Sequence, residues 1–194
     1  MEFPTEKKHI AIIDFEATCS NKGEIPREET EIIEFACVVV DRELNEVARF
    51  SEFVKPVIHP RLTDFCLKLT SIKQRQVDLA DPFPRVLEKF VKKIVSPFHP
   101  LFASWGAYDK HQLKRDCNYH RVPYPFDNEH LDIKRWIPRF YEFRKPKSIG
   151  QMLHYLGMEF IGTPHRGIDD VENIIRILRV TQELERKRKE DSRV

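Results

Sequence analysis

The stretch "IAIIDFEATC", residues 10–19, joins an apolar strand to two carboxylates, a combination that few folds can accommodate. Four apolar residues lead into Asp14 and Glu16, which are separated by one residue. Because side chains alternate along a strand, both carboxylates point to the same face. Two acids side by side repel each other unless something positively charged lies between them. The stretch therefore predicts a strand that ends at a cation-binding site.

The order of the expected elements indicates a mixed α/β fold. Residues 9–15, 31–41 and 46–56 have the pattern of strands, and a short turn around Asn45 fits an antiparallel meander. We then expect helices at residues 63–69, 83–95, 107–120, 148–158 and from about 167 onward, and short strands at residues 100–106 and 129–133. This order gives a mixed sheet with helices on both faces. It is compatible with a ribonuclease-H-like architecture and also with other α/β folds.

Length and composition favour one domain. The chain has 194 residues and no internal repeat, so we expect a single domain, 1–194, with a core of about residues 8–184 and a charged C-terminal tail that frays. No apolar run approaches the roughly 20 residues of a membrane helix, and the first residues, "MEFPTEKK", lack the apolar part of a secretory signal. The four cysteines are scattered without a C-x-x-C pair, which favours neither a zinc knuckle nor disulfides. We therefore expect an intracellular, cytoplasmic protein.

Charge is distributed unevenly, although the net charge is only +2. Residues 1–60 carry 7 basic and 13 acidic side chains, whereas residues 61–107 carry 8 and 4 and residues 108–147 carry 10 and 6. This asymmetry suits an anionic ligand held beside an acidic, metal-binding centre. The simpler alternative is an ordinary solvated surface of mixed charge.

Further acids lie at helix starts that are distant in the sequence. Asp109 opens the helix after "SWGAY", and Asp170 follows His165 by five residues in "HRGIDDVENI". Each has an ordinary alternative role, because acids stabilise helix N-termini and a loop histidine needs no function. Together with Asp14 and Glu16, however, they match the oxygen-rich ligand set that two Mg²⁺ or Mn²⁺ ions require. Two such ions, ~3.5–4 Å apart, support phosphodiester hydrolysis.

At this level the chain resembles the DEDDh family of 3′–5′ exonucleases. Its Eri-type branch, which includes histone-mRNA 3′ exonucleases and KapD-like proteins, is the closer match. The segments that carry the resemblance are "DFEATC", "EIIEF", "LTDFCLKLTSI", "QVDLADPFPRVL", "SWGAYDK", "SIGQMLHYLGM" and "HRGIDDVENI". They extend from about residue 8 to 184.

The resemblance implies a role for each residue of the acidic set. Asp14, Glu16 and Asp170 would hold the catalytic ion, and Asp14 would also touch the second ion. Asp109 would bind the second ion, largely through water. His165, on a mobile loop, would be the general base that takes a proton from the attacking water. The expected reaction releases nucleoside 5′-monophosphates from the 3′ end of single-stranded RNA or DNA.

The resemblance also implies substrate contacts. Backbone amides around Ala17 and Thr18 would meet the terminal sugar, which favours a free 3′ end. Phe65 and Tyr108 would lie against the terminal nucleotide, where stacking is worth roughly 1–3 kcal/mol per base. Core packing is the alternative role for Phe65. Lys110 would meet a backbone phosphate.

One position departs from the family pattern. Ser71, in "LTSI", stands where the family usually has Gly, the residue that enters left-handed backbone conformations without strain. The departure concerns substrate preference more than catalysis. Two other functions stay open: a catalytically silent nucleic-acid-binding module, and a phosphatase that uses the same ions. The sequence does not distinguish RNA from DNA or identify protein partners.

Overall fold

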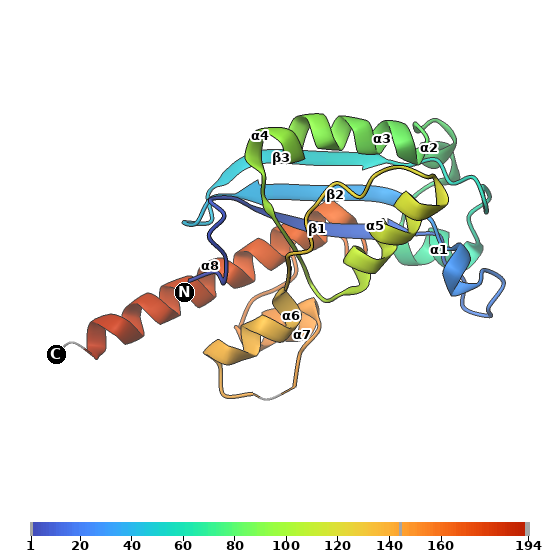
Figure 1. Cartoon of the computed structure of the whole chain (residues 1–194). Coiled ribbons are helices and arrows are strands. Elements are labelled where there is room, and N and C mark those ends of the chain that lie inside the picture. The colour runs from blue at the N-terminus through green and yellow to red at the C-terminus, as the bar shows by residue number, and fades with distance from the viewer. Residues whose placement is uncertain (1, 144, 193–194) are drawn as a thin grey trace.

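Figure 1 shows the computed structural model, which describes residues 2–143 and 145–192. Its centre is a five-stranded sheet in the order β3-β2-β1-β4-β5. The strands are β1 (Ile10–Ala17), β2 (Ile32–Val40), β3 (Glu46–Phe53), β4 (Leu101–Ser104) and β5 (His130–Asp132). The first three strands pair antiparallel, as the meander predicted, while β4 is parallel to β1 and β5 is parallel to β4.

Helices cover both faces of this sheet, as expected. They are α1 (Asp64–Thr70), α2 (Gln74–Asp78), α3 (Phe83–Phe90), α4 (Ser96–Phe98), α5 (Tyr108–Tyr119), α6 (Ile133–Trp136), α7 (Ile149–Tyr155) and α8 (Gly167–Asp191). A π-helical turn, η2 (Val91–Val95), joins α3 to α4, and short 3₁₀ turns lie at η1 (Arg27–Glu29) and η3 (Ile137–Phe140). In Figure 1, α3 and α4 lie above the sheet and α6 and α7 lie below it.

Alternation along β1 divides the core into two layers. Ile10 and Ile12 belong to the cluster formed with α6, α7 and α8, whereas Ile13 and Phe15 belong to the cluster formed with α3 and α5. Phe15 packs edge-on against Phe35 of β2 with ring centroids 4.5 Å apart. Asp14 and Glu16 have the parity of Ile10 and Ile12, so their carboxylates emerge on the α8 side of the sheet.

Close packing at the start of α8 brings that helix against the middle strands. A Cβ atom at Gly167 would lie 2.9 Å from the Asp14 carbonyl oxygen and 2.9 Å from the Ala36 Cβ atom. Only a glycine allows α8 to begin this near to β1 and β2. The first turn of α8 is thereby placed beside the acids of β1.

The end of α8 contains the charged tail, whose fraying stays a prediction. The helix continues to Asp191, and its last buried side chain is Thr181. Figure 1 shows this C-terminal half projecting away from the body of the molecule. Ion pairs one helical turn apart, such as Lys187 with Glu183, support the exposed part. Within the described residues, no helix combines the length and apolar character needed to cross a membrane.

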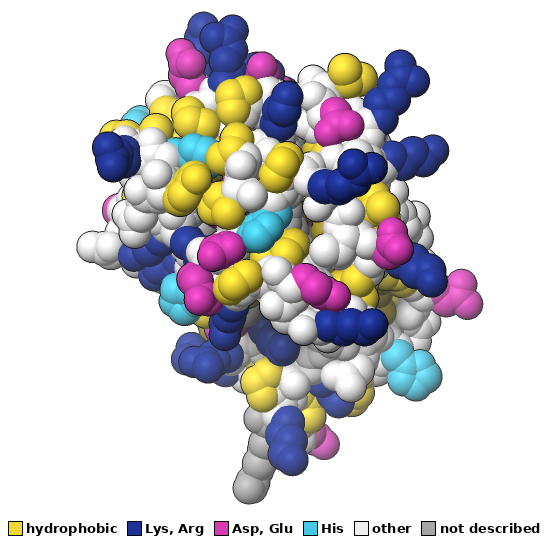
Figure 2. All heavy atoms as spheres, turned by 90° about the vertical axis from the view of Figure 1, so that its right-hand side faces the viewer, with side chains coloured by type: hydrophobic (Ala, Val, Ile, Leu, Met, Phe, Trp, Pro, Cys, Tyr) yellow, Lys and Arg dark blue, Asp and Glu magenta, His cyan; other side chains and the backbone are white. Residues whose placement is uncertain are grey.

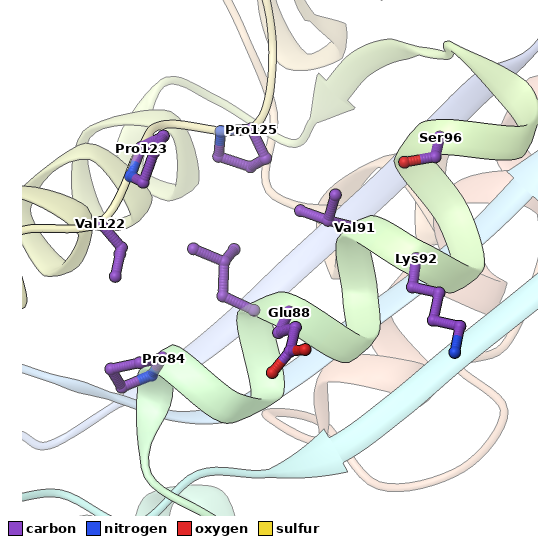
Figure 3. Close-up of a pocket in the computed structure, with 9 residues that line it drawn as sticks. Pro84, Glu88, Val91, Lys92, Ser96, Val122, Pro123 and Pro125 are labelled. Carbon is purple, nitrogen blue, oxygen red and sulfur yellow. The ribbon is translucent and has the colours of Figure 1, made fainter.

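The surface has a mixed character and one apolar groove. On the face shown in Figure 2, Lys and Arg are interspersed with Asp and Glu, and apolar side chains gather in the upper half. A groove of about 540 Å³ lies between α3–η2 and the segment that follows α5 (Figure 3). It is lined by Pro84, Leu87, Glu88, Val91, Lys92, Ser96, Val122, Pro123 and Pro125. None of these residues belongs to the acidic set predicted from the sequence.

Candidate active site

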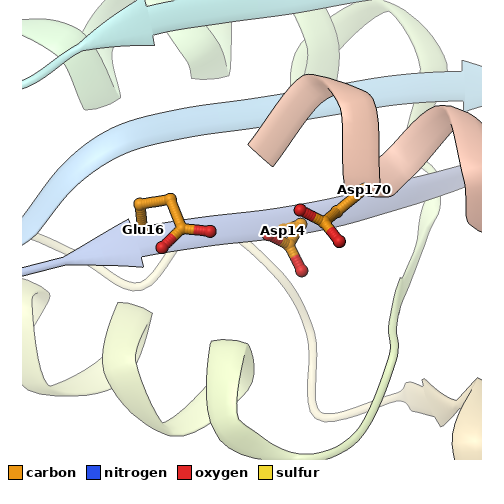
Figure 4. A group of neighbouring side chains, drawn as sticks. All are labelled: Asp14, Glu16 and Asp170. Carbon is orange, nitrogen blue, oxygen red and sulfur yellow. The ribbon is translucent and has the colours of Figure 1, made fainter. Parts of the chain in front are cut away.

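Three of the predicted acids converge at the point where α8 meets β1. Asp14 and Glu16 of β1 and Asp170 of α8 each place one carboxylate oxygen within 4.8 Å of the others. Figure 4 shows the Asp14 and Asp170 side chains close together, with the Glu16 carboxylate directed toward them. Asp14 and Asp170 are 156 positions apart in the sequence, and the packing of α8 on β1 brings them together.

Asp109 joins this group from the other side of β1. It lies in the first turn of α5, is 4% exposed, and accepts a hydrogen bond from the Phe15 amide at 3.0 Å. It is not one of the three acids that lie within 4.8 Å of one another. The hydrogen bond fixes Asp109 to the strand that carries Asp14 and Glu16.

Burial makes this cluster a poor environment for negative charge alone. Burial is the main reason that the pKa of Glu16 rises to about 9, that of Asp109 to about 7 and that of Asp170 to about 6. The pKa of Asp14 is also raised, first by burial and then by the neighbouring acids, with Asp109 foremost. At neutral pH the cluster must therefore retain protons or bind cations. Its all-oxygen donor set fits hard divalent cations.

The loop that carries His165 is fastened to α8. The His165 side chain is exposed and its φ is 64°, while its amide donates to Asp170 Oδ2 at 2.8 Å. The Thr163 amide donates to Asp169 Oδ2 at 2.8 Å. The Ile161 amide donates to Asn173 Oδ1 at 3.2 Å. The first two turns of α8 thus accept hydrogen bonds from three backbone amides of this loop, and its mobility stays a prediction.

These residues share one cavity of about 510 Å³. Its lining combines predicted site residues, Asp14, Glu16, Tyr108, Asp109, His165 and Asp170, with others that the sequence did not indicate, Phe15, Trp105, Lys134, Ser148, Ile149, Gly150, Phe160 and Pro164. The cavity thus holds the acids, an imidazole, aromatic side chains and one lysine. This combination of groups suits a ligand that is a phosphate ester with an attached nucleobase.

Comparison with known proteins identifies the family. The model of the Exonuclease family (RNase_T) matches residues 11–178. The chain belongs to this family. It is 38% identical over 178 residues to human 3'-5' exoribonuclease 1, covering 87% of this chain and 51% of that protein. It is 33% identical over 188 residues to human ERI1 exoribonuclease 2, covering 85% of this chain and 27% of that protein.

Solved structures share the exonuclease fold. The nuclease domain of 3'hExo, a DEDDh family member bound to rAMP, has a TM-score of 0.82 and 36% identity, covering 92% of this chain and 94% of that chain. An exonuclease I structure with 13% identity and a TM-score of 0.73 shows the fold alone, covering 91% of this chain and 41% of that one. The predicted ribonuclease-H-like α/β fold and the Eri-type DEDDh resemblance are confirmed. The chain spans about half the length of the 3'-5' exoribonuclease 1 relatives.

Not all the residues that were predicted to contact a substrate line the cavity. Tyr108 lines it and is 42% exposed. Phe65 is half-buried and lines a different hollow, with Thr63 and Lys68 among its neighbours. Lys110 donates to the Asn128 carbonyl at 3.2 Å and is not a lining residue.

The remaining predicted contacts lie at the end of β1. Ala17 and Thr18 are buried, and the Thr18 amide donates to the Glu31 carbonyl at 2.8 Å. That amide is therefore already engaged within the protein. Ser71 ends α1 with a φ of 58°, so it does occupy the left-handed region in which the family usually has Gly.

Sequence reasoning missed an ion pair behind the His165 loop. Arg166 donates to Glu34 from Nε at 3.1 Å and from Nη2 at 2.9 Å, and the Gly167 amide donates to the same carboxylate at 3.1 Å. Glu34 is 1% exposed and lies in the otherwise apolar strand β2. A buried acid within such a strand requires a positively charged or hydrogen-bonding partner. Glu34 in an apolar strand was therefore the feature of the sequence that could have indicated this ion pair.

Proposed function

We propose that the chain is a metal-dependent 3′–5′ exonuclease that releases nucleoside 5′-monophosphates from single-stranded RNA or DNA. The observation that carries this proposal is the convergence of Asp14, Glu16, Asp109, Asp170 and His165 in one cavity, in a chain of the Exonuclease family. A catalytically silent binding module would have no need for the complete set.

Divalent cations fit the acidic cluster. The oxygens of Asp14, Glu16 and Asp170 lie within 4.8 Å of one another, and burial raises the pKa of each acid, so a positive charge would relieve their repulsion. We propose that these three acids hold one ion and that Asp14 and Asp109 hold the second. Mg²⁺ and Mn²⁺ both match the ligand set. Two such ions would supply activation of a water and stabilisation of the leaving oxygen.

The protein's own groups supply the other parts of the reaction. The exposed imidazole of His165 lines the cavity and would take the proton of the attacking water. The hydrogen bond from the His165 amide to Asp170 keeps this base beside the acids. Tyr108, on the cavity wall, would stack on the terminal base.

The proposed substrate is a single strand with a free 3′ end. One structural relative was solved with rAMP bound, and another is described as recognising the 3′ end of the histone mRNA stem-loop. We therefore propose single-stranded RNA as the first substrate to test, with DNA beside it.

The test is digestion of end-labelled RNA and DNA oligonucleotides with Mg²⁺, Mn²⁺ or a chelator. Nucleoside monophosphates should appear with either ion, and a 3′-phosphate on the substrate should protect it. Asp14→Ala should abolish hydrolysis in a folded protein, whereas the matched variant Asp191→Ala, at the exposed end of α8, should retain it. Cleavage inside a circular substrate, or full activity of folded Asp14→Ala, would contradict the proposal.

His165 is tested separately because it acts on the proton rather than on the ions. His165→Ala should slow turnover by roughly 10²–10⁴-fold, which is the usual contribution of a general base. Binding of a single strand, measured by fluorescence anisotropy in Ca²⁺, should change little. An unchanged turnover rate would remove His165 from the role of base.

A further inference from the structure

Lys147 and a group of aromatic side chains adjoin residues 148–150, the segment that forms one rim of the cavity. Ser148, Ile149 and Gly150 line the cavity, and Lys147 directly precedes them. The indole Nε1 of Trp105, another lining residue, donates to the Lys147 carbonyl at 3.0 Å. This bond fixes the backbone of Lys147 at the cavity mouth.

The Lys147 side chain lies over two aromatic rings. Its Nζ atom is 4.8 Å from the ring centroid of Phe143 and 5.6 Å from that of Tyr155. Tyr155 is 49% exposed and meets Phe143 edge-on at 5.1 Å. Phe143 stacks on Tyr141, whose hydroxyl is 2.7 Å from Thr181 Oγ1 of α8. The aromatic group is thus anchored to the fold at Tyr141 and open to solvent at Tyr155.

Two lysine side chains supply positive charge at this rim. Lys134 lines the cavity, with its Cδ atom close to Gly106. Among the residues that the structure describes, neither Lys134 nor Lys147 forms an ion pair with a carboxylate. The hollow beside Phe65 differs, because Glu24 and Asp64 line it together with Lys22 and Lys68. The Lys147 rim is therefore the more favourable path for phosphates leaving the cavity.

A single strand needs such a path if the proposed function holds. An exonuclease cuts off the terminal nucleotide, so the remainder of the strand must leave the cavity on its upstream side. Proteins that bind single strands combine cations for the phosphates with exposed aromatic faces for the bases. We propose that Lys134, Lys147 and Tyr155 form an upstream subsite that binds nucleotides beyond the terminal one. This inference rests on the proposed exonuclease function and names further contacts for its substrate.

The experiment compares substrates with and without upstream nucleotides. An octanucleotide fills the subsite, whereas the p-nitrophenyl ester of thymidine 5′-monophosphate has no upstream nucleotide. The quantity compared is kcat/KM for the octanucleotide divided by kcat/KM for the ester. Tyr155→Ala and Lys147→Ala should each lower this ratio by about ten-fold, because one stack or one phosphate contact is lost. The conservative variants Tyr155→Phe and Lys147→Arg should retain most of the ratio.

A matched control is available on the other side of the molecule. Lys93 also lies over an aromatic ring, that of Phe50, at 6.0 Å, but it belongs to η2, which packs in the core layer on the opposite face of the sheet from α7. Lys93→Ala should leave the ratio unchanged. An equal fall in Lys93→Ala, or no fall in Lys147→Ala and Tyr155→Ala, would overturn the subsite.

Two further readouts separate stacking from charge. Abasic substitution at one of the upstream positions should weaken cleavage by the wild type and have little further effect in Tyr155→Ala. Octanucleotide binding in Ca²⁺ is measured by anisotropy across a salt series. The slope of log K against log salt should be smaller in magnitude by about 0.7 in Lys147→Ala than in the wild type.

The binding measurement also keeps this inference distinct from the proposed function. A wild type that cleaves neither substrate, yet binds the octanucleotide with the expected Lys147 dependence, would overturn the function and support the subsite. The opposite result is also distinct. If the wild type cleaves, but Lys147→Ala binds the octanucleotide with the affinity and salt slope of the wild type, the function is supported and the subsite is overturned.

Discussion

The ion pair between Glu34 and Arg166 offers a sharp test of how the His165 loop is held. Glu34 is 1% exposed, and its carboxylate accepts two bonds from the Arg166 guanidinium and one from the Gly167 amide. The hydrogen-bonded carboxylate raises the pKa of Arg166, as a strong pair should. Arg166→Met removes the guanidinium and leaves a buried carboxylate with the Gly167 amide as its remaining partner from this set.

The magnitude follows from burial. Breaking one side of a buried ion pair costs about 3–5 kcal/mol, because the remaining charge stays desolvated. The Arg166 side chain is 26% exposed, so the lower end, about 3 kcal/mol, applies. Glu34→Gln with Arg166→Met removes both charges and leaves an amide that can still accept from Gly167. The double variant should therefore lose only about 1 kcal/mol.

The assay is urea unfolding of the four proteins in this double-mutant cycle. Arg166→Met should lower the unfolding midpoint with little change in the m-value, and the double variant should recover most of the loss. Because Arg166 follows His165 directly, kcat should fall in the single variant, while KM for a short oligonucleotide changes little. Two results would refute the view that the Glu34–Arg166 pair holds the loop. One is additive losses of unfolding free energy in the double variant, and the other is an Arg166→Met protein whose unfolding free energy lies within about 0.5 kcal/mol of the wild type.

Three further predictions concern the start of α8 and the acidic cluster. Gly167→Ala should cost about 1–3 kcal/mol of unfolding free energy and lower activity, because its Cβ would press on the Asp14 carbonyl; Gly150→Ala, with no atom within 4 Å, should not destabilise. Asp170→Asn should keep the His165 loop in place but abolish hydrolysis, and full activity would exclude Asp170 as an ion ligand. The metal-free protein should lose unfolding free energy as pH rises from about 4 to 7, because the folded acids keep protons that the unfolded chain has released. The gain in Tm on adding Mn²⁺ should accordingly be larger near pH 8 than near pH 5, and equal gains would refute the link between burial and ion binding.

Much of the fold was predictable because its strands have strong patterns. The β1 and β2 segments are apolar and β3 alternates, so the strands of the meander were placed within three residues at each end. The helices α2 and α6 were missed, because five and four residues are too few to show a helical period. The end of α8 was expected to fray, since its exposed charges carry no information about packing.

The candidate site was predictable where chemistry and position coincide. An acid at the end of an apolar strand or in the first turn of a helix is noticeable in sequence, so the sequence singled out Asp14, Glu16, Asp109 and Asp170, which line one cavity. Lys134 and Lys147 carry no such signal, because exposed lysines are common. Lys134 lines the cavity, and Lys147 directly precedes the lining residue Ser148, because the segments after β5 fold back onto the cavity. Such a relation cannot be derived from local pattern.

The arrangement of α8 couples the proposed base to the proposed ion site. Asp170 contributes an oxygen to the acidic cluster and also accepts the hydrogen bond of the His165 amide. On the other side of His165, Arg166 and Gly167 are bound to β2 through Glu34. A shift of α8 along the sheet would therefore move the acid and the imidazole together. The geometry between the proposed base and the proposed ion site is set by the packing of one helix on two strands, and Gly167 makes that packing possible.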